Sequence, residues 1–375
     1  MKGIFLYYKT IDYDNLTGID KKVLWQIDTL STNGNSCELL TINNSRNRRS
    51  IEKIDQFLSL LPFTNRYPKW KYLNEFSDAD FIYLRRPTCF TTHTIKILKN
   101  IKEKNPRCLI ILEIPTYPYD EEMKVKWIYY PLYIKDKYNR RKLKKYVDVI
   151  AVQNDVNEIF GIPTVRFSNG IKVDEISIRK PTIMNNDEIY MCAIATLNPW
   201  QGYERIIQGM HKYYDEGGSR KVSLHIVGDG SELQYYKKLT QQLNLHDRVF
   251  FHGRLYGEKL DEIYNCADLG LDAFGRYKTD NSISTSLKSR EYLAKGLPIV
   301  SGCKVDILDS ESPYYLEFKG DSSPIDINRI IEFYDDIYKS GLRKVEVSEK
   351  IRNYAYNVCD VSKTMEQINR FINNK

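Results

Sequence analysis

A short segment of mixed charge, SLKSREYLAKGLPIV from Ser286 to Val300, brings one acidic and three basic side chains close together. Its pattern predicts a helix of about two turns that ends at Gly296 and is followed by a strand. Lys288, Glu291 and Lys295 are spaced i, i+3 and i+7, so they share one face of that helix. The spacing fits a solvated face with an ion pair worth a few tenths of a kcal/mol, and it also fits a group of charges that binds a polar ligand.

The composition describes a folded chain with room for two domains. Of its 375 residues, 42% are hydrophobic and 28% are charged, as in ordinary globular proteins. The seven cysteines are odd in number and show no CxxC spacing, which favours reduced thiols over a disulfide framework or a zinc site. The first residues, MKGIFLYYKTIDYD, turn acidic too early for a signal peptide, and no apolar run approaches the roughly 20 residues of a membrane span. We therefore expect a cytoplasmic protein.

Positive charge is concentrated in one segment of a chain whose net charge is +7. Between Lys124 and Lys145, nine residues are basic and only Asp136 is acidic. Nucleic acid, an anionic membrane surface or a solvated face could each account for this charge. Aromatic rings that suit the headgroup layer of a membrane stand at its start: Trp127, Tyr129, Tyr130 and Tyr133. Because no nucleic-acid motif accompanies the segment, we expect no nucleic-acid partner, and we favour a peripheral membrane contact over a solvated face.

Apolar runs and helical patterns alternate along most of the chain. GIFLYY, CELLTI, DFIYLRR, CLIILEI and VDVIAVQ predict strands in the first half, and EIYMCAIATL, VSLHIVG, RVFFHG, LGLDAF and PIVSG predict strands in the second. Runs that are apolar on both faces are typical of parallel sheets covered on both sides. The fold class predicted is α/β, with two doubly wound, Rossmann-like domains whose strand ends face a central cleft where ligands bind.

The domain boundary is expected where periodicity is lost and polar residues collect. Both changes occur in SNGIKVDEISIRKPTIMNND, which begins at Ser168. They predict a first domain over residues 1–170, a linker over 171–187 and a second domain over 188–350. Residues 351–375 are expected to form a C-terminal helix that packs back on the first domain. No GxGxxG motif follows a strand, which argues against a dinucleotide dehydrogenase.

Several stretches, taken in order, resemble group 1 glycosyltransferases, retaining enzymes of the GT-B architecture. In the second half these are HIVGDGSELQYYKKL, RVFFHGRL, ADLGLDAF and REYLAKGLPIV, preceded by SNGI at Ser168–Ile171. In the first half, NLTGIDKKVLWQIDTLSTNG resembles the family's first loop and helix, with Gly18 at the turn that faces the cleft. The resemblance implies transfer of a sugar from a nucleotide-sugar donor, without a metal or other cofactor.

The resemblance also implies roles for particular residues. In the family pattern Glu-(Ala/Tyr)-x-Ala-x-Gly-x-Pro, which Glu291 and the residues after it match, the carboxylate accepts hydrogen bonds from the ribose hydroxyls. The loop SISTS before the helix would seat the diphosphate on backbone N–H groups. The predicted donor-binding residues are Gly18, Thr196, Gly228, Gly253, Arg254, Ser284, Thr285, Ser286, Leu287, Lys288 and Glu291.

The sequence departs from the family where positive charge is expected. Thr196 and Gln201 stand at positions where the family usually has an Arg and a Lys on the diphosphate, and Ile283 replaces a second Glu that touches the donor sugar. A diphosphate leaving group needs cations, and Lys288 is the first candidate as catalytic cation, followed by Arg290, with Arg276 and Lys278 as further candidates.

The first domain departs from the family as well. A frequent histidine is absent, and LEIPTYPYDEE offers acceptor-side candidates instead: Glu113, Tyr117 and Asp120. The pattern LKxREYxAxGxP with WxGYxR resembles a subgroup that assembles polysaccharides. The expected function is a retaining glycosyltransferase that extends a glycan, lipid-linked, for a bacterial surface polysaccharide such as a capsule. The alternatives are a non-catalytic GT-B subunit that binds a sugar nucleotide or a partner transferase, and, less favoured without a signal peptide, a periplasmic-type binding protein.

Overall fold

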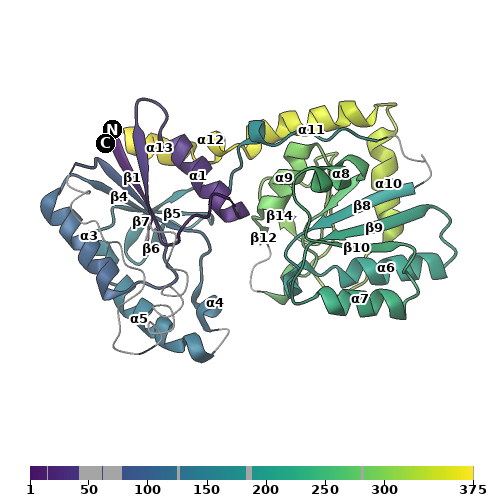
Figure 1. Cartoon of the computed structure of the whole chain (residues 1–375), viewed down its shortest axis with the longest axis horizontal. Helices are drawn as coiled ribbons and strands as arrows, with labels where there is room; N and C mark the ends of the chain where they lie inside the picture. Colours follow the sequence, from purple (N-terminus) through teal and green to yellow (C-terminus); the bar gives the residue numbers. More distant parts are fainter. Residues whose placement is uncertain are drawn as a thin grey trace. The chain divides into compact units, whose positions relative to one another are not determined.

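The chain divides into two compact units, shown with their elements in Figure 1. The first unit comprises Met1–Asn169 and Thr364–Lys375, and the second comprises Gly170–Lys363. The computed structural model describes residues 1–14, 16–41, 61, 78–124, 127–182, 188–279 and 283–374. Residues 183–187 of the predicted linker and Lys126 of the basic segment lie outside the described residues, and so does the side chain of Trp127.

The described part of the first unit contains a seven-stranded sheet in the order β2-β1-β3-β4-β5-β7-β6. All neighbouring strands pair in parallel except β6, which is antiparallel to β7. Strands β3, β4 and β5 are buried along their whole length because helices cover both faces of the sheet. The strands are β1 (Lys2–Tyr7), β2 (Ser36–Thr41), β3 (Phe81–Arg85), β4 (Leu109–Ile114), β5 (Val149–Val152), β6 (Glu158–Ile159) and β7 (Ile162–Arg166).

Helices of the first unit lie on both sides of this sheet, with α1 (Gly18–Leu30) on one side and α3 (Thr92–Lys104) on the other (Figure 1). The first begins at a capping box between Thr17 and Asp20, which satisfies its otherwise unpaired backbone N–H groups. The other helical segments are α4 (Asp120–Lys124), η2 (Trp127–Tyr129), α5 (Tyr130–Arg140), η3 (Leu143–Lys145) and α13 (Glu366–Asn373).

The described part of the second unit contains a six-stranded parallel sheet in the order β10-β9-β8-β11-β13-β15. Its strands are β8 (Glu188–Ile194), β9 (Lys221–Val227), β10 (Val249–Gly253), β11 (Leu269–Leu271), β13 (Ile299–Ser301) and β15 (Tyr315–Glu317). A separate pair joins β12 (Ile283–Ser284) to β14 (Lys304–Val305). The strand order changes direction between β8 and β11, because β9 and β10 follow β8 on one side and β13 and β15 follow β11 on the other. Doubly wound sheets have this arrangement and bind ligands at the carboxyl ends of their strands.

Helices again cover both faces of the second sheet. Figure 1 shows α6 and α7 on one side, and α8 and α9 on the other. Helix α9 ends at Gly296, whose left-handed backbone (φ 80°) closes the helix without steric cost. The helical segments are η4 (Val173–Glu175), η5 (Pro199–Gln201), α6 (Glu204–Asp215), α7 (Leu233–Gln242), α8 (Glu258–Cys266), η6 (Arg276–Lys278), α9 (Leu287–Lys295), α10 (Ile327–Tyr338), α11 (Lys344–Val358) and α12 (Val361–Thr364).

The predicted α/β class with two parallel sheets is confirmed. The ten apolar runs interpreted as strands all contain strands, whereas the short β6, β7, β12, β14 and β15 carry too little apolar pattern to be predicted. The C-terminal segment differs from the expectation of one helix on the first domain. Helix α11 packs on α9 within the second unit, and only the segment from Thr364 onward belongs to the first, where Ile368 and Ile372 are buried.

Candidate functional site

The loops that follow neighbouring strands of the second unit are tied together through their backbones. The amide of Ala195, after β8, donates to the carbonyl of Val227 at 3.0 Å, and the amide of Gly228 donates to Gly253 at 2.7 Å. Gly228 has a φ of 134°, and a Cβ there would lie 1.8 Å from the carbonyl oxygen of Ala195. This position therefore requires glycine, and the predicted pair Gly228 and Gly253 lies together at the carboxyl end of the sheet.

The loops after β8 and β11 also touch. The amide of Phe274 donates to the carbonyl of Gln201 at 2.7 Å. Gly202 has a φ of 64°, and a Cβ on it would lie 2.3 Å from the backbone nitrogen of Gly275. The close approach of the two backbones fixes η5 against η6, and with it the side chain of Gln201.

A buried carboxylate gathers the polar groups at this edge of the sheet. Asp272 follows β11 and is fully buried, and its Oδ1 accepts a hydrogen bond from the Ser286 hydroxyl at 2.9 Å. The ammonium of Lys288 lies 3.2 Å from the same oxygen and donates to Gln201 Oε1 at 2.5 Å and to the Tyr203 hydroxyl at 3.2 Å. We call these five residues the Asp272 cluster.

The charges of this cluster balance each other. Burial alone would raise the pKa of Asp272, but the neighbouring Lys288 charge and the hydrogen bonds from Ser286 and Lys288 bring that pKa below its ordinary value. Burial lowers the pKa of Lys288, an effect that Asp272 opposes. The carboxylate and the ammonium therefore form an ion pair whose net charge is close to zero.

Arg290, the second candidate for a catalytic cation, is placed elsewhere. Its side chain is fully buried, and Nη2 contacts the two carboxylate oxygens of Asp306 at 2.5 and 2.6 Å. Nη1 donates to the carbonyl of Ser286 at 3.1 Å. The prediction that Arg290 meets the leaving group is wrong, because a buried guanidinium held by a bidentate pair is not open to a ligand. Arg290 instead holds Asp306, the residue after β14, against α9.

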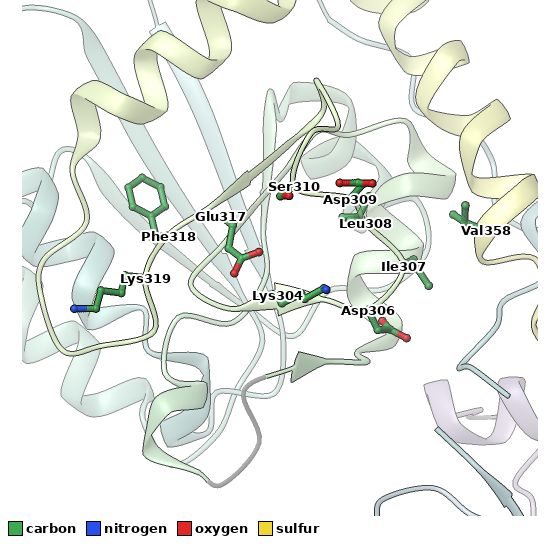
Figure 2. A pocket seen from close by; sticks show the side chains of 10 residues that line it. All are labelled: Lys304, Asp306, Ile307, Leu308, Asp309, Ser310, Glu317, Phe318, Lys319 and Val358. Carbon is green, nitrogen blue, oxygen red and sulfur yellow. The ribbon is translucent and has the colours of Figure 1, made fainter. Parts of the chain in front are cut away.

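Asp306 also lines a pocket of about 840 Å³ in the second unit (Figure 2). Charged side chains of both signs face it, including Lys304 and Glu317. Its lining comes from β14, the loop after it, the end of β15 and the last residue of α11: Lys304, Asp306, Ile307, Leu308, Asp309, Ser310, Glu317, Phe318, Lys319 and Val358.

Glu291 is half-buried on α9 and faces α8. After burial itself, its carboxylate is the main cause that raises the pKa of Tyr264, so the two side chains lie close together. The other charged residues of that predicted face have different partners: Lys288 pairs with Asp272, and Lys295 donates to Asp261 at 2.5 Å. The solvated face with an i, i+3 ion pair is therefore the wrong interpretation of this helix.

The rest of the predicted donor set is divided between the two units. Ser286 is the N-cap of α9, where its hydroxyl accepts from the amide of Ser289, and the carbonyl of Thr196 accepts from the Gln201 side chain at 3.2 Å. Arg254 is exposed and pairs with Asp229 at 3.3 Å. Ser284 ends β12, Thr285 joins it to the N-cap, Leu287 is the first residue of α9, and Gly18 is the first residue of α1 in the other unit.

Glu113 does not serve as the acceptor-side residue predicted for it. It is fully buried at the end of β4 and is held by several donors. Lys22 Nζ lies at 3.2 Å, Gln26 Nε2 at 2.9 Å and the Tyr83 hydroxyl at 2.8 Å, and Arg85 contacts the same carboxylate. Burial opposes ionisation, but Arg85 and Lys22 lower the pKa of Glu113 to about 2. It is a structural anion that a substrate cannot reach.

The other two acceptor-side candidates remain accessible. Asp120 opens α4 and pairs with Arg140, whose hydrogen bonds lower the pKa of the Asp120 carboxyl. Tyr117 is half-buried, with its ring centroid 6.1 Å from that of Phe160.

The sequence interpretation missed residues that complete the site. Asp272 and Tyr203 lie in the Asp272 cluster, and Tyr264 lies beside Glu291. The signal for Asp272 was present in ADLGLDAF, where an acidic residue ends an apolar strand. Tyr203 stands in WQGYER, but only the tertiary contact shows that it meets Lys288.

Among the described residues, no group of three or more His, Cys, Asp or Glu side chains is placed to hold a metal ion. None of the described helices is both long enough and apolar enough to cross a membrane. The seven cysteines form no disulfide.

Comparison with known proteins finds a family match in part of the second unit. Residues 174–272 match the family model of glycosyl transferases group 1, while no curated protein sequence matches the chain. The fold is similar to HepE of Anabaena in complex with UDP and glucose, with a TM-score of 0.58, 15% identity and 100% of each chain covered.

Two further solved structures share the fold. Sucrose-phosphate synthase from Thermosynechococcus elongatus has a TM-score of 0.61 at 13% identity, with 100% of this chain and 99% of that chain covered. The lipopolysaccharide outer core galactosyltransferase WaaB, in its apo form, has a TM-score of 0.60 at 12% identity, with 100% of each chain covered. Residues 174–272 therefore match group 1 glycosyl transferases, and the chain as a whole, with its two Rossmann-like units, shares the fold of these solved structures.

Proposed function

We propose that the protein transfers a sugar, with retention of configuration, from a nucleotide-sugar donor to a lipid-linked glycan in the synthesis of a bacterial surface polysaccharide. The observation that carries this proposal is the Asp272 cluster. It brings the ammonium of Lys288 to 2.5 Å from Gln201, the position where the family usually has a lysine. The departure at Gln201 is thus accompanied by a cation from another element.

The site offers a binding surface for each part of the donor. Helix α9 presents its first backbone N–H groups beside Ser286, and this end of a helix favours a diphosphate. Glu291 lies on the same helix, is half-buried, and can accept two hydrogen bonds from ribose hydroxyls. In this proposal positive charge for the leaving group comes from side chains and the helix end, without a metal.

The uridine nucleotides are the first donors to test. HepE, which shares the fold, has been solved in complexes with UDP, with UDP-glucose, and with UDP and glucose.

A lipid-linked acceptor is supported by the exposed face of α5 in the first unit. Tyr130, Ile134 and Tyr138 recur at i, i+4 and i+8 and are 52%, 54% and 62% exposed. Basic side chains surround this stripe, and the ammonium of Lys142 lies 3.9 Å from the centroid of the Tyr138 ring. An exposed apolar stripe flanked by cations suits an anionic membrane surface on the cytoplasmic side of a cell.

One basic residue of this segment has a different role. Arg140 is largely buried, pairs with Asp120 at 2.5 Å and with Asp136 at 3.6 Å, and stacks over Phe160. Among the described residues of the segment, the charges open to lipid include those on the exposed side chains Lys137, Arg141, Lys144 and Lys145.

A non-catalytic subunit that binds a sugar nucleotide or a partner transferase is the second candidate. The pairing of Lys288 with Asp272 favours it, because a compensated cation stabilises a departing diphosphate less than an isolated one.

A turnover assay separates these two functions. The purified protein is incubated with UDP-, GDP- and ADP-linked sugars and a membrane lipid extract that contains glycan acceptors. Nucleotide release and the anomeric configuration of the product are followed by NMR. Release with a retained anomer supports the transferase. Donor binding without release with any acceptor supports the non-catalytic subunit, and an inverted anomer contradicts retention.

A further inference from the structure

Arg276 begins η6, directly after the loop that leaves β11. Its position is fixed through the backbone, because the amide of Gly275 donates to the carbonyl of Trp200 at 3.2 Å and Phe274 donates to Gln201. The ammonium of Lys288 contacts the side chain of the same Gln201. Arg276 therefore lies at the carboxyl end of the sheet, beside the Asp272 cluster.

Four neighbouring cations of the second unit are paired with carboxylates. Arg205 lies 3.3 Å from Asp321, and three further cations have partners of their own: Lys278 with Glu204, Lys288 with Asp272, and Arg290 with Asp306. Among the described residues, no carboxylate lies at ion-pair distance from the Arg276 guanidinium. Within the described part of the chain, no ion pair neutralises the positive charge of Arg276.

The side chain is partly buried and not saturated with hydrogen bonds. Its exposure is intermediate, and its Nε is buried without a hydrogen-bond partner among the described residues. The guanidinium is close enough to Lys288 to contribute to the lowered pKa of that lysine, and it acts in the same direction on the Cys303 thiol. A partly buried donor without an acceptor is costly unless a ligand supplies one.

We propose that Arg276 binds the diphosphate of a nucleoside diphosphate at the strand ends of the second unit and stabilises it as a leaving group. The inference rests on the proposed function and assigns to Arg276 the charge that Thr196 and Gln201 cannot supply. A guanidinium suits the task because its planar fork matches two phosphate oxygens. Lys288 then acts as a positioning residue, which holds Gln201 and Asp272 beside the bound diphosphate.

The test compares UDP, GDP and ADP with their nucleosides uridine, guanosine and adenosine. Binding of the diphosphates is measured by titration calorimetry, and binding of the nucleosides by ligand-observed NMR. We expect Arg276→Ala to weaken the preferred diphosphate by about 10-fold to 100-fold, the effect of losing a hydrogen bond to a charged group. Nucleoside binding stays unchanged, and Arg276→Lys recovers part of the diphosphate affinity.

Arg343→Ala is the matched control, since Arg343 is an exposed arginine of the same unit that pairs with Glu346. It should bind the diphosphate as the unmodified protein does. Equal losses for diphosphate and nucleoside in Arg276→Ala would show a structural role and overturn the inference, as would unchanged diphosphate affinity. If the unmodified protein binds none of the three diphosphates, the proposed function fails together with the inference.

Discussion

The ammonium of Lys288 lies 3.2 Å from the carboxylate of Asp272, and both groups are largely shielded from solvent. An interior ion pair is held in place by mutual attraction, and removal of one partner leaves the other charge buried and uncompensated. The pair therefore couples the stability of the second unit to the geometry of its candidate site.

The first prediction follows from this coupling. Lys288→Ala should lower the free energy of unfolding by roughly 3–5 kcal/mol, because Asp272 then stays buried without its counter-charge. Urea denaturation measures the change. Lys212→Ala, at an exposed i, i+4 pair on α6, is the control and should change stability by less than about 0.5 kcal/mol. The double variant Lys288→Ala, Asp272→Asn should recover part of the loss. If Lys288→Ala unfolds at the same urea concentration as the unmodified protein, the pair is not structural.

The second prediction concerns Glu291. Glu291→Gln keeps the shape of the side chain but removes its charge, so we expect donor binding to weaken by roughly 1.5–3 kcal/mol. Titration calorimetry with the preferred donor measures this loss, and a melting curve verifies that the variant is folded. Glu262→Gln, an exposed position on α8, should bind the donor normally. Normal donor affinity in folded Glu291→Gln would remove Glu291 from the ribose site.

The strands could be predicted because buried parallel strands need apolar residues on both faces, and LGLDAF and CLIILEI show this directly. The partners of charged residues could not be predicted in the same way. Helical spacing places Lys288 and Glu291 on one face, but the tertiary fold aims one at β11 and the other at α8. Glu113 was predicted as a site residue because the sequence does not show its hydrogen-bond donors. These donors lie on α1 and β3, far away in the sequence.

The third prediction concerns the exposed face of α5. Replacement of Lys137, Arg141 and Lys144 with Ser should weaken binding to vesicles that contain anionic lipid. Each basic residue near such a surface contributes about 1 kcal/mol, so the triple variant should lose about 3 kcal/mol, or roughly a hundredfold in partitioning. Vesicle sedimentation at physiological salt measures the loss.

A second triple variant separates a specific face from net charge. Lys237, Lys238 and Lys259 are exposed in the second unit, and their replacement with Ser removes the same charge from another surface. It should bind anionic vesicles as the unmodified protein does. Equal binding of the unmodified protein to neutral and anionic vesicles would contradict electrostatic docking.

The fourth prediction concerns the buried carboxylate of the first unit. Glu113→Gln leaves Lys22 and Arg85 buried without their counter-charge, so we expect a loss of roughly 3–5 kcal/mol in the free energy of unfolding. Because the pKa of Glu113 is lowered to about 2, its contribution is complete above about pH 4.5 and is lost as the pH falls toward 2. Glu103→Gln, at an exposed pair on α3, is the control. Equal denaturation midpoints for the two variants would refute the structural role.

The fifth prediction concerns His225 on β9, whose Nδ1 lies 3.0 Å from Nε2 of His252. Burial, followed by the neighbouring His252, lowers the pKa of His225 from 6.5 to about 4. The unfolded chain therefore takes up a proton at a higher pH than the folded chain, and stability should fall as the pH drops from about 6.5 to 4. Melting curves across this range should show a smaller decrease for His225→Gln than for the unmodified protein. His211→Gln, at an exposed position of α6, should follow the unmodified protein. If His225→Gln has the same pH profile, the loss of stability comes from other groups and the imidazole pair does not resist protonation.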